Sequence, residues 1–356
     1  MVGVPCMVMR GGTSKGAFFL SNDLPADPAE RDALLIAVMG SPDPRQIDGI
    51  GGATPLTSKV AVISDSARSD ADIDYLFLQV SVDQALVSDR QNCGNLLAAT
   101  AQFAVERGLI VVTGPSASVR VYMSNTNSVA TSTFPVDDGL PVYVGATAID
   151  GVPRTAARVQ LEFAEIAGGS CGALLPTGSA IDRIDGVAVT MVDNGMPVVV
   201  MRATDLGITG AETPDELDSN DALRARLESI RLQAGQLMGL GDVTEATVPK
   251  LTMVSPPTGG GDLSTRTFIP HRCHEAIGVL GAVSVATAAL LPGSPAADVV
   301  RTGAGLDGII VCEHPTGSFT ATIDIDTSTN PPIARRADII RTARKLMDGV
   351  VFPASP

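Results

Sequence analysis

The amino-acid sequence predicts an α+β fold of two pseudo-symmetric domains, each a mainly antiparallel, β-barrel-like sheet wrapped around a central helix. Three observations support this prediction. The chain has 356 residues, which suits two domains of ordinary size better than one large domain. Hydrophobic residues make up 45% of the chain and aromatic residues only 3%, so the cores must consist mainly of aliphatic side chains. The predicted elements of the first half also recur, in the same order, in the second half.

Each half begins with a hairpin and a helix. Residues 6–20 and 189–201 have the pattern of two strands joined by a glycine-containing turn. Each hairpin precedes a stretch with apolar residues at helical spacing, at 28–39 in the first half and at 221–238 in the second. The two halves therefore start with the same elements.

The later elements of the two halves match as well. A strand, a helix rich in small residues and a second hairpin occur in each half; the matched segments are 57–63 with 248–254, 93–104 with 280–289, and 121–134 with 310–325. Chance similarity of Val- and Ala-rich segments is the alternative, but the shared order of all these elements argues against it. We place the first domain at 1–185, completed by the C-terminal segment 338–356, and the second at 186–337.

Composition and charge argue against several classes of function. The formal net charge of −14 disfavours nucleic acid, which requires a basic surface. The five cysteines are widely spaced without a CxxC pair, which argues against a disulfide framework and a structural zinc site. We see no signal peptide, and the apolar run 277–291 is too short and too rich in Gly and Ser to span a membrane. We expect a cytoplasmic protein with reduced thiols and no bound metal, and we leave a homodimer open.

The segment from Asn92 to Asn95 is the strongest candidate for chemistry. It places Cys93 and Gly94 where a helix is expected to begin, with Asn92 as the N-cap. Backbone N–H groups and the positive end of a helix dipole favour a thiolate or a bound carboxylate. We therefore predict a cysteine placed for acid/base chemistry on an anionic substrate. The alternative is a packed thiol at a helix end.

Lys59 is the candidate for the second acid/base group. The position that matches Cys93 in the second half is Leu280, which cannot ionise, so a symmetric pair of thiols is absent from the sequence. Lys59 begins a predicted strand directly after Ser58, which is itself a candidate substrate contact. Partial burial or a neighbouring cation would make the free amine available as a base. A surface lysine or an electrostatic clamp is the alternative interpretation.

The turn in the first hairpin is a candidate binding site for carboxylates. It carries Arg10, Thr13, Ser14 and Lys15 around two glycines. Its spacing does not match a nucleotide-binding phosphate loop, and no helix follows directly. Cationic and hydroxyl side chains on a glycine turn suit a carboxylate. A tight hairpin with solvated charges is the alternative.

The second half supplies further candidates for substrate binding. His271 precedes the second small-residue helix, which carries Gly281 and Ser284, and His314 precedes a turn. The two histidines at 271 and 274 lack the spacing of a metal-binding helix motif. If a pseudo-twofold axis relates the halves, the two helix N-termini face one another across a cleft and suit a ligand with several carboxylates. A turn histidine is the alternative for His314.

The chain resembles the PrpF family, which has a diaminopimelate-epimerase-like fold of two pseudo-symmetric domains. The resemblance covers almost the whole chain and rests on segments 9–16, 40–43, 46–49, 57–60, 92–95 and 314–317. Within the family, segments 45–49, 91–95 and 341–349 most resemble 4-oxalomesaconate tautomerases of gallate and protocatechuate breakdown. The resemblance implies Lys59 and Cys93 as the acid/base residues. Leu280 departs from the epimerases, which have a second cysteine there, so migration of a double bond is favoured over racemisation.

The function implied is a cofactor-independent isomerase that moves a double bond by 1,3-proton transfer in an unsaturated tricarboxylate. Lys59 would remove the proton, and Cys93 would either return it or only position the substrate. An isomerase of 2-methylaconitate or aconitate shares these motifs and stays open. Outside the enzymes, a carboxylate-binding module is the alternative. A thiol redox enzyme is disfavoured because Cys93 has no resolving cysteine near it in the sequence.

Overall fold

The computed structural model describes residues 3–89, 92–244 and 246–354, which form two compact units. Unit 1 consists of Met1–Glu162 with Ile340–Pro356, and unit 2 of Phe163–Ile339. The first boundary therefore comes earlier than the expected residue 185. The reason is that segment 163–185 bonds to unit 2, where Ser170 and Cys171 donate backbone N–H groups to Asp193 Oδ2, each over 2.8 Å. The C-terminal segment Ile340–Pro356 belongs to unit 1.

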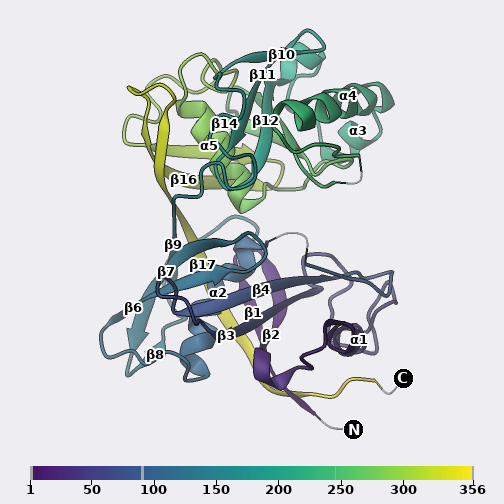
Figure 1. Ribbon diagram of the computed structural model, residues 1–356, viewed down its shortest axis with the longest axis vertical. Helices are drawn as coiled ribbons and strands as arrows, with labels where there is room; N and C mark the ends of the chain where they lie inside the picture. The colour runs from purple at the N-terminus through teal and green to yellow at the C-terminus, as the bar shows by residue number, and fades with distance from the viewer. Residues whose placement is uncertain (1–2, 90–91, 245, 355–356) are drawn as a thin grey trace. The chain divides into compact units, whose positions relative to one another are not determined.

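Unit 1 is a closed sheet around one helix (Figure 1). Its helices are α1 (Pro28–Met39) and α2 (Gly94–Glu106), and its strands are β1 (Val4–Gly11), β2 (Ser14–Leu20), β3 (Lys59–Asp65), β4 (Ile73–Val80), β5 (Val87–Ser88), β6 (Ser116–Met123), β7 (Ser128–Asp137), β8 (Leu140–Pro141), β9 (Arg158–Ala164) and β17 (Ile333–Val351). The pairing runs β1, β2, β3, β4, β6, β7, β9, β17 and back to β1. Helix α2 contacts β1–β4 and β6–β8 from inside this ring.

Unit 2 likewise consists of a sheet that packs against a central helix. Its helices are α3 (Pro214–Asp218), α4 (Asp221–Leu237) and α5 (Val279–Leu290), and its strands are β10 (Asp182–Ile184), β11 (Val187–Asp193), β12 (Pro197–Arg202), β13 (Lys250–Ser255), β14 (Leu263–Phe268), β15 (Ile309–His314) and β16 (Gly317–Asp326). Helix α5 contacts β11, β12, β15 and β16. The first residues of β17 pair with β16.

The strand directions confirm the internal repeat. In unit 1 the successive pairs β1–β2, β2–β3, β3–β4, β4–β6 and β6–β7 alternate between antiparallel and parallel. The pairs β11–β12, β12–β13, β13–β14, β14–β15 and β15–β16 of unit 2 alternate in the same order. Most strand pairs are antiparallel, so the predicted α+β class with pseudo-symmetric halves is confirmed.

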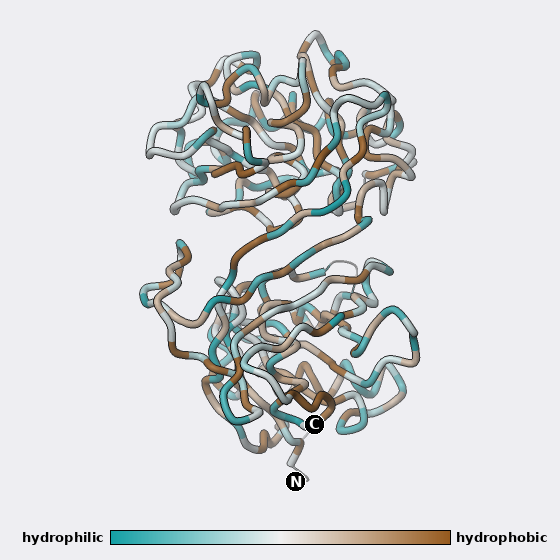
Figure 2. Tube along the Cα trace, turned by 90° about the vertical axis from the view of Figure 1, so that its left-hand side faces the viewer, coloured by the Kyte–Doolittle hydropathy of each residue, from teal (hydrophilic) through white to brown (hydrophobic). Residues whose placement is uncertain are grey.

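Each sheet has two faces with different partners. We call the face toward the central helix, α2 or α5, the inner face, and the opposite face the outer face. On the outer face, α1 packs against one core cluster of unit 1, and α4 packs against one of unit 2. Alternate strand residues point to opposite faces, and in Figure 2 hydrophobic and hydrophilic stretches alternate along the chain. Among the described residues, no helix is long and apolar enough to cross a membrane.

Small residues allow α2 to lie close to the surrounding strands. Ala98, Ala99 and Ala101 of this helix are completely buried. A Cβ atom on Gly16 of β2 would come within 2.8 Å of the Leu96 side chain, closer than carbon atoms pack. The strand can therefore approach the first turn of α2 only because residue 16 is glycine.

Candidate active site

Cys93 occupies the N-cap position of α2. Its backbone is extended, with φ −125° and ψ 94°, and its carbonyl accepts the first helical hydrogen bond from Leu97 N at 3.0 Å. The N-cap is therefore one residue later than predicted, because the Asn92 side chain accepts from Cys93 N (2.7 Å) and not from the first turn. No described side chain caps the N–H groups of that turn. The thiol thus lies beside backbone donors that favour an anion.

The turn between β1 and β2 lies against the start of α2. Asn95 Nδ2 donates to Thr13 Oγ1 at 3.1 Å. Gly12 has φ +51°, and a Cβ atom there would collide with the Asn95 side chain. The structure therefore brings Thr13 and Asn95, two of the candidate binding residues, into contact beside Gly94 and Cys93.

Lys59 begins β3 on the inner face of unit 1. Its neighbours Val60 and Val62 belong to the outer core cluster, so Lys59 and Ala61 point toward α2. The side chain is buried, with 8% exposure for the residue. Its Nζ donates to Gln79 Oε1 at 3.0 Å and lies 4.9 Å from the centre of the Phe77 ring. A surface lysine is therefore ruled out.

Strand β4 connects Lys59 with Cys93. Tyr75, Phe77 and Gln79 are alternate residues of β4 and share its inner face. The Tyr75 hydroxyl donates to the carbonyl oxygen of Cys93 at 3.2 Å, while Gln79 accepts from Lys59. Residues two apart on a strand are separated by roughly 7 Å, so Tyr75 and Gln79, which are four apart, are separated by about 13 Å along β4. Burial raises the pKa of Tyr75 well above its usual value, with the nearby Cys93 acting in the same direction, so the phenol remains a donor.

A second glutamine organises the loop that leads to Lys59. Gln46 is buried and donates to Ser41 Oγ at 3.1 Å and Ser58 Oγ at 2.7 Å, and it accepts from Ala53 N at 2.9 Å. Ser58 is completely buried, so in place of the predicted substrate contact its hydroxyl bonds to this loop. A hollow between the loop and β4–β5 reaches Gln79; its lining includes Pro44, Ala53, Pro55, Ser81 and Leu86.

The predicted carboxylate site on the first turn divides into two parts. Arg10 Nη1 donates to the carbonyls of Gly12 (2.8 Å) and Thr342 (3.0 Å) and to Thr342 Oγ1 (3.0 Å), so it joins the turn to β17 in place of a substrate. Burial and the charge of Arg344 lower the pKa of Arg10. The Ser14 hydroxyl is buried without a hydrogen-bond partner among the described residues. Lys15 forms no ion pair within the described part of the chain.

In unit 2, the start of α5 resembles that of α2. Gly278 is its N-cap, and no described side chain caps the first turn. A Cβ atom on Gly281 would meet no atom within 4 Å, so open space adjoins this turn. Ser284, in contrast, donates to the Met196 carbonyl at 2.7 Å and accepts from Asn194 N at 3.1 Å. It fastens α5 to the β11–β12 turn, in place of the predicted substrate contact.

Asn125 and His314 occupy the same position in the two halves, and each lies where the chain is fixed just before the central helix of its unit. Asn125 exchanges hydrogen bonds with the Phe77 backbone (2.8 and 2.9 Å) and donates to the Asp89 carbonyl at 2.7 Å, before α2. His314 ends β15, and its Nδ1 lies 3.3 Å from Thr316 Oγ1. That hydroxyl donates to the Glu275 carbonyl at 2.8 Å, before α5. The turn at His314 therefore fixes the approach to α5.

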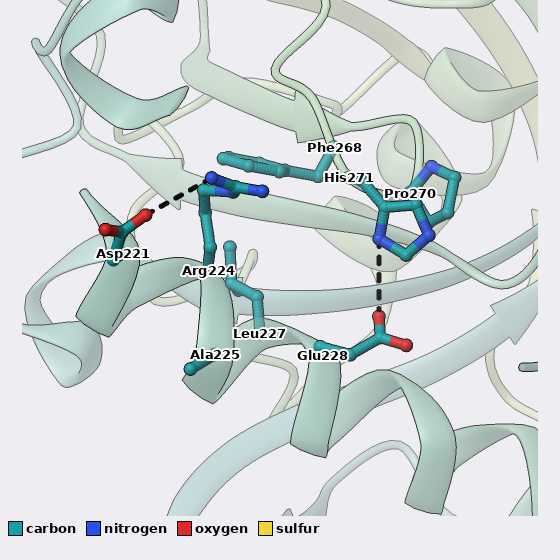
Figure 3. A pocket seen from close by; sticks show the side chains of 8 residues that line it. All are labelled: Asp221, Arg224, Ala225, Leu227, Glu228, Phe268, Pro270 and His271. Atoms are coloured by element: carbon teal, nitrogen blue, oxygen red, sulfur yellow. Dashed lines mark hydrogen bonds and ion pairs between the residues drawn. The ribbon is translucent and has the colours of Figure 1, made fainter. Parts of the chain in front are cut away.

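His271 lies against α4 on the outer side of unit 2. Figure 3 shows its ring directed at Glu228, with Nδ1 3.8 Å from Oε2, while Arg224 pairs with Asp221 beside Phe268. The side chain of His271 is 59% exposed. The partner of His271 in the structure is therefore Glu228 of α4. Among the described residues, no group of three or more His, Cys, Asp or Glu side chains could hold a metal ion.

The other four cysteines are suited to structural roles. Burial raises the pKa of Cys6 and of Cys312 to about 12, and that of Cys273 to about 11. Burial and the carboxylate of Asp193 likewise raise the pKa of Cys171 to about 12. These thiols remain protonated at neutral pH and are poor nucleophiles.

Tyr75 and Gln79 were not among the residues predicted from the sequence. The only available signal was the alternation of β4, which places Tyr75, Phe77 and Gln79 on one face. That signal does not reveal the strand register, and only the register puts Gln79 opposite Lys59.

Comparison with known proteins gives consistent matches over the whole chain. The family model described as "PrpF protein" matches residues 1–353. The chain is 58% identical over 352 residues to a protein of Novosphingobium sp. (strain KA1) named (4E)-oxalomesaconate Delta-isomerase, covering 99% of this chain and 98% of the relative. It is 54% identical over 348 residues to the 4-oxalomesaconate tautomerase of Pseudomonas putida, covering 98% and 95%. The crystal structure of a methylitaconate-delta-isomerase superposes with a TM-score of 0.86 at 34% identity, covering 98% of this chain and 95% of that one.

Proposed function

The chain belongs to the PrpF family and is an isomerase, and from this premise we propose that it moves a carbon–carbon double bond of 4-oxalomesaconate by cofactor-independent proton transfer. The observation that carries the proposal is the attachment of Lys59 and Cys93 to one face of β4, through Gln79 and Tyr75. A buried amine and a thiol at a helix start form an acid/base pair for a small carboxylate substrate.

The proposed reaction begins with removal of a proton by Lys59. The free amine takes this proton from the carbon next to the alkene, and the electron pair delocalises into a dienolate. The uncapped N–H groups at the start of α2 and the cationic side chain of Lys15 stabilise the developing negative charge. A proton then returns to the far end of the allylic system, or to oxygen if the product is an enol. One proton is removed and one is returned, so substrate and product have the same composition and are isomers.

Two roles fit Cys93. The thiol lies beside the first turn of α2, where it can return the proton, and the same position lets it orient a carboxylate on the helix N–H groups. Lys15, Thr13 and Asn95 are the other proposed contacts of unit 1. We also propose that the start of α5 binds a carboxylate, because open space adjoins Gly281.

The proposed function is tested by hydrogen exchange into the substrate. Incubation of 4-oxalomesaconate with the protein in deuterated water, followed by NMR, is expected to show deuterium at the carbons of the allylic system. 2-Methylaconitate and aconitate run in parallel decide between the proposed substrate and the alternatives. Exchange into neither 4-oxalomesaconate nor the two analogues would leave only a carboxylate-binding module.

Changing the partner of Lys59 tests its role as the base. We expect Gln79→Glu to lower kcat/KM by about tenfold or more, because the added carboxylate would form an ion pair with Lys59 in place of the present hydrogen bond and oppose removal of a substrate proton by the amine. The measurement is kcat/KM with 4-oxalomesaconate. Gln233→Glu, on the exposed side of α4, is the matched control. A kcat/KM equal to that of the unchanged protein would contradict the assignment.

A further inference from the structure

We propose that Lys250 is the cationic group of a carboxylate-binding site in unit 2. The protein has only four lysines (Lys15, Lys59, Lys250 and Lys345) beside 21 arginines. Two of the four occupy the same place in the repeat. Lys59 begins β3 opposite Gly16 of β2, and Lys250 begins β13 opposite Val198 of β12.

Lys250 lies on the inner face of its sheet. Its neighbours Leu251 and Met253 belong to the core cluster that packs against α4, so Lys250 and Thr252 point to the other side. Val199, which follows the register partner Val198, belongs to the same outer cluster. The alternation of both β12 and β13 therefore places the Lys250 side chain on the inner face.

The environment of Lys250 differs from that of Lys59 in one decisive way. In unit 1, Phe77 and Gln79 hold the ammonium of Lys59. The matching positions of unit 2 are Thr267, whose hydroxyl is already bonded to Thr252 at 3.0 Å, and Ile269, which has no acceptor in its side chain. Lys250 consequently has neither a hydrogen bond nor an ion pair within residues 3–89, 92–244 and 246–354.

The charges around Lys250 favour an anion. The charged group of α4 that acts on it is Arg231, and the guanidinium of Arg231 is already bound by both carboxylate oxygens of Glu228 at 2.7 Å. The chain has 39 acidic residues, and Lys345 does pair with one of them, Glu106. A partly buried ammonium that none of the described carboxylates neutralises is suited to an external carboxylate.

The site requires the protonated amine. Burial and the charge of Arg231 lower the pKa of Lys250 to about 8. The ammonium is present below this pH and is lost above it, so carboxylate binding should weaken as the pH rises through 8. The carboxylate can belong to the substrate, an arm that rests on the proposed function, or to a second small carboxylic acid.

Direct binding tests the site independently of turnover. Propane-1,2,3-tricarboxylate serves as the probe because it has three carboxylates and no double bond to move. We expect Lys250→Met to weaken its binding, measured by calorimetry at pH 7, by about 10- to 100-fold. Lys250→Arg, which keeps the charge, should bind within about threefold of the unchanged protein and should lose the decline above pH 8. Lys345→Met is the matched control, and thermal unfolding shows whether each variant is folded.

Amine labelling gives a second measurement on the unchanged protein. With an acetylating N-hydroxysuccinimide ester at pH 8, Lys250 should be acetylated faster than Lys345, and the tricarboxylate should protect Lys250 alone of these two. If KM for the proposed substrate rises in Lys250→Met by the same factor as the probe Kd, with kcat little changed, the carboxylate belongs to the substrate. If only the probe affinity falls, it belongs to a second ligand. The inference would be overturned if a folded Lys250→Met variant kept the probe affinity of the unchanged protein and the probe did not protect Lys250. If the unchanged protein showed no proton exchange, only the proposed function would be refuted.

Discussion

Replacement of Lys59 by methionine is expected to abolish turnover, with a fall in kcat of about 10³-fold or more. The reason is that methionine has a similar length but no amine to take the proton. Its apolar side chain can still pack over Phe77, so the fold should persist. The measurement is the steady-state rate with 4-oxalomesaconate, together with deuterium exchange at long incubation times.

The Cys93→Ser variant completes this prediction. A serine hydroxyl keeps the position at the start of α2 but is a much weaker acid than a thiol, so we expect slow but measurable turnover, reduced by about 10- to 100-fold. Cys93→Ala separates the two roles of the thiol. If the thiol donates a proton, the Cys93→Ala variant should turn over much more slowly than Cys93→Ser, and if the thiol only positions the substrate, the two variants should have similar rates. Lys345→Met is the control for loss of a lysine. A larger loss in Cys93→Ser than in Lys59→Met would remove Lys59 as the principal base.

Replacement of Arg231 by leucine is expected to destabilise the protein by about 3–5 kcal/mol. Arg231 is completely buried and donates to Glu228 and to the carbonyls of Val243 and Ala246, at 2.7–3.2 Å. These hydrogen bonds hold the pKa of Glu228 below its usual value. Leucine would leave the carboxylate and the carbonyls without their donor. In a unit of this size the Tm should fall by about 10 °C, measured by calorimetry.

A second arginine of α4 supplies the matched control. Arg224 pairs with Asp221 at 3.3 Å, but the side chain of Asp221 is 93% exposed, so Arg224→Leu should change stability by less than about 1 kcal/mol. A similar small effect for Arg231→Leu would show that the buried network contributes little to folding.

Most of the fold was predictable because each predicted element of the first half has a counterpart in the second half, so the two predictions support each other. The helices at 28–39 and 93–104 and their counterparts at 221–238 and 280–289 agree with α1, α2, α4 and α5. The domain boundary was harder to predict, because segment 163–185 contains few regular elements. Its attachment to Asp193 depends on backbone N–H groups, which have no signature in the sequence.

The candidate site was predictable only in part. Cys93 and Lys59 could be selected from the sequence because a thiol and an amine are acid/base groups, and both residues are buried. The groups that position them, Tyr75 and Gln79, are ordinary strand residues until the register of β3 and β4 is known. For Ser58 and Ser284, the sequence gives no indication of whether protein or ligand is the partner of the hydroxyl, and in the structure both hydroxyls bond to protein groups.

Strand β17 has a consequence for how the molecule is made. Its residues 343–351 pair with β1 and complete the ring of unit 1, although they follow the whole of unit 2 in the chain. During translation, β1 therefore lacks its neighbour on one edge until β17 has emerged from the ribosome. Unit 2 lies between these two segments in the chain and can form in the interval. The unit that carries Lys59 and Cys93 is thus completed only after unit 2 has been synthesised.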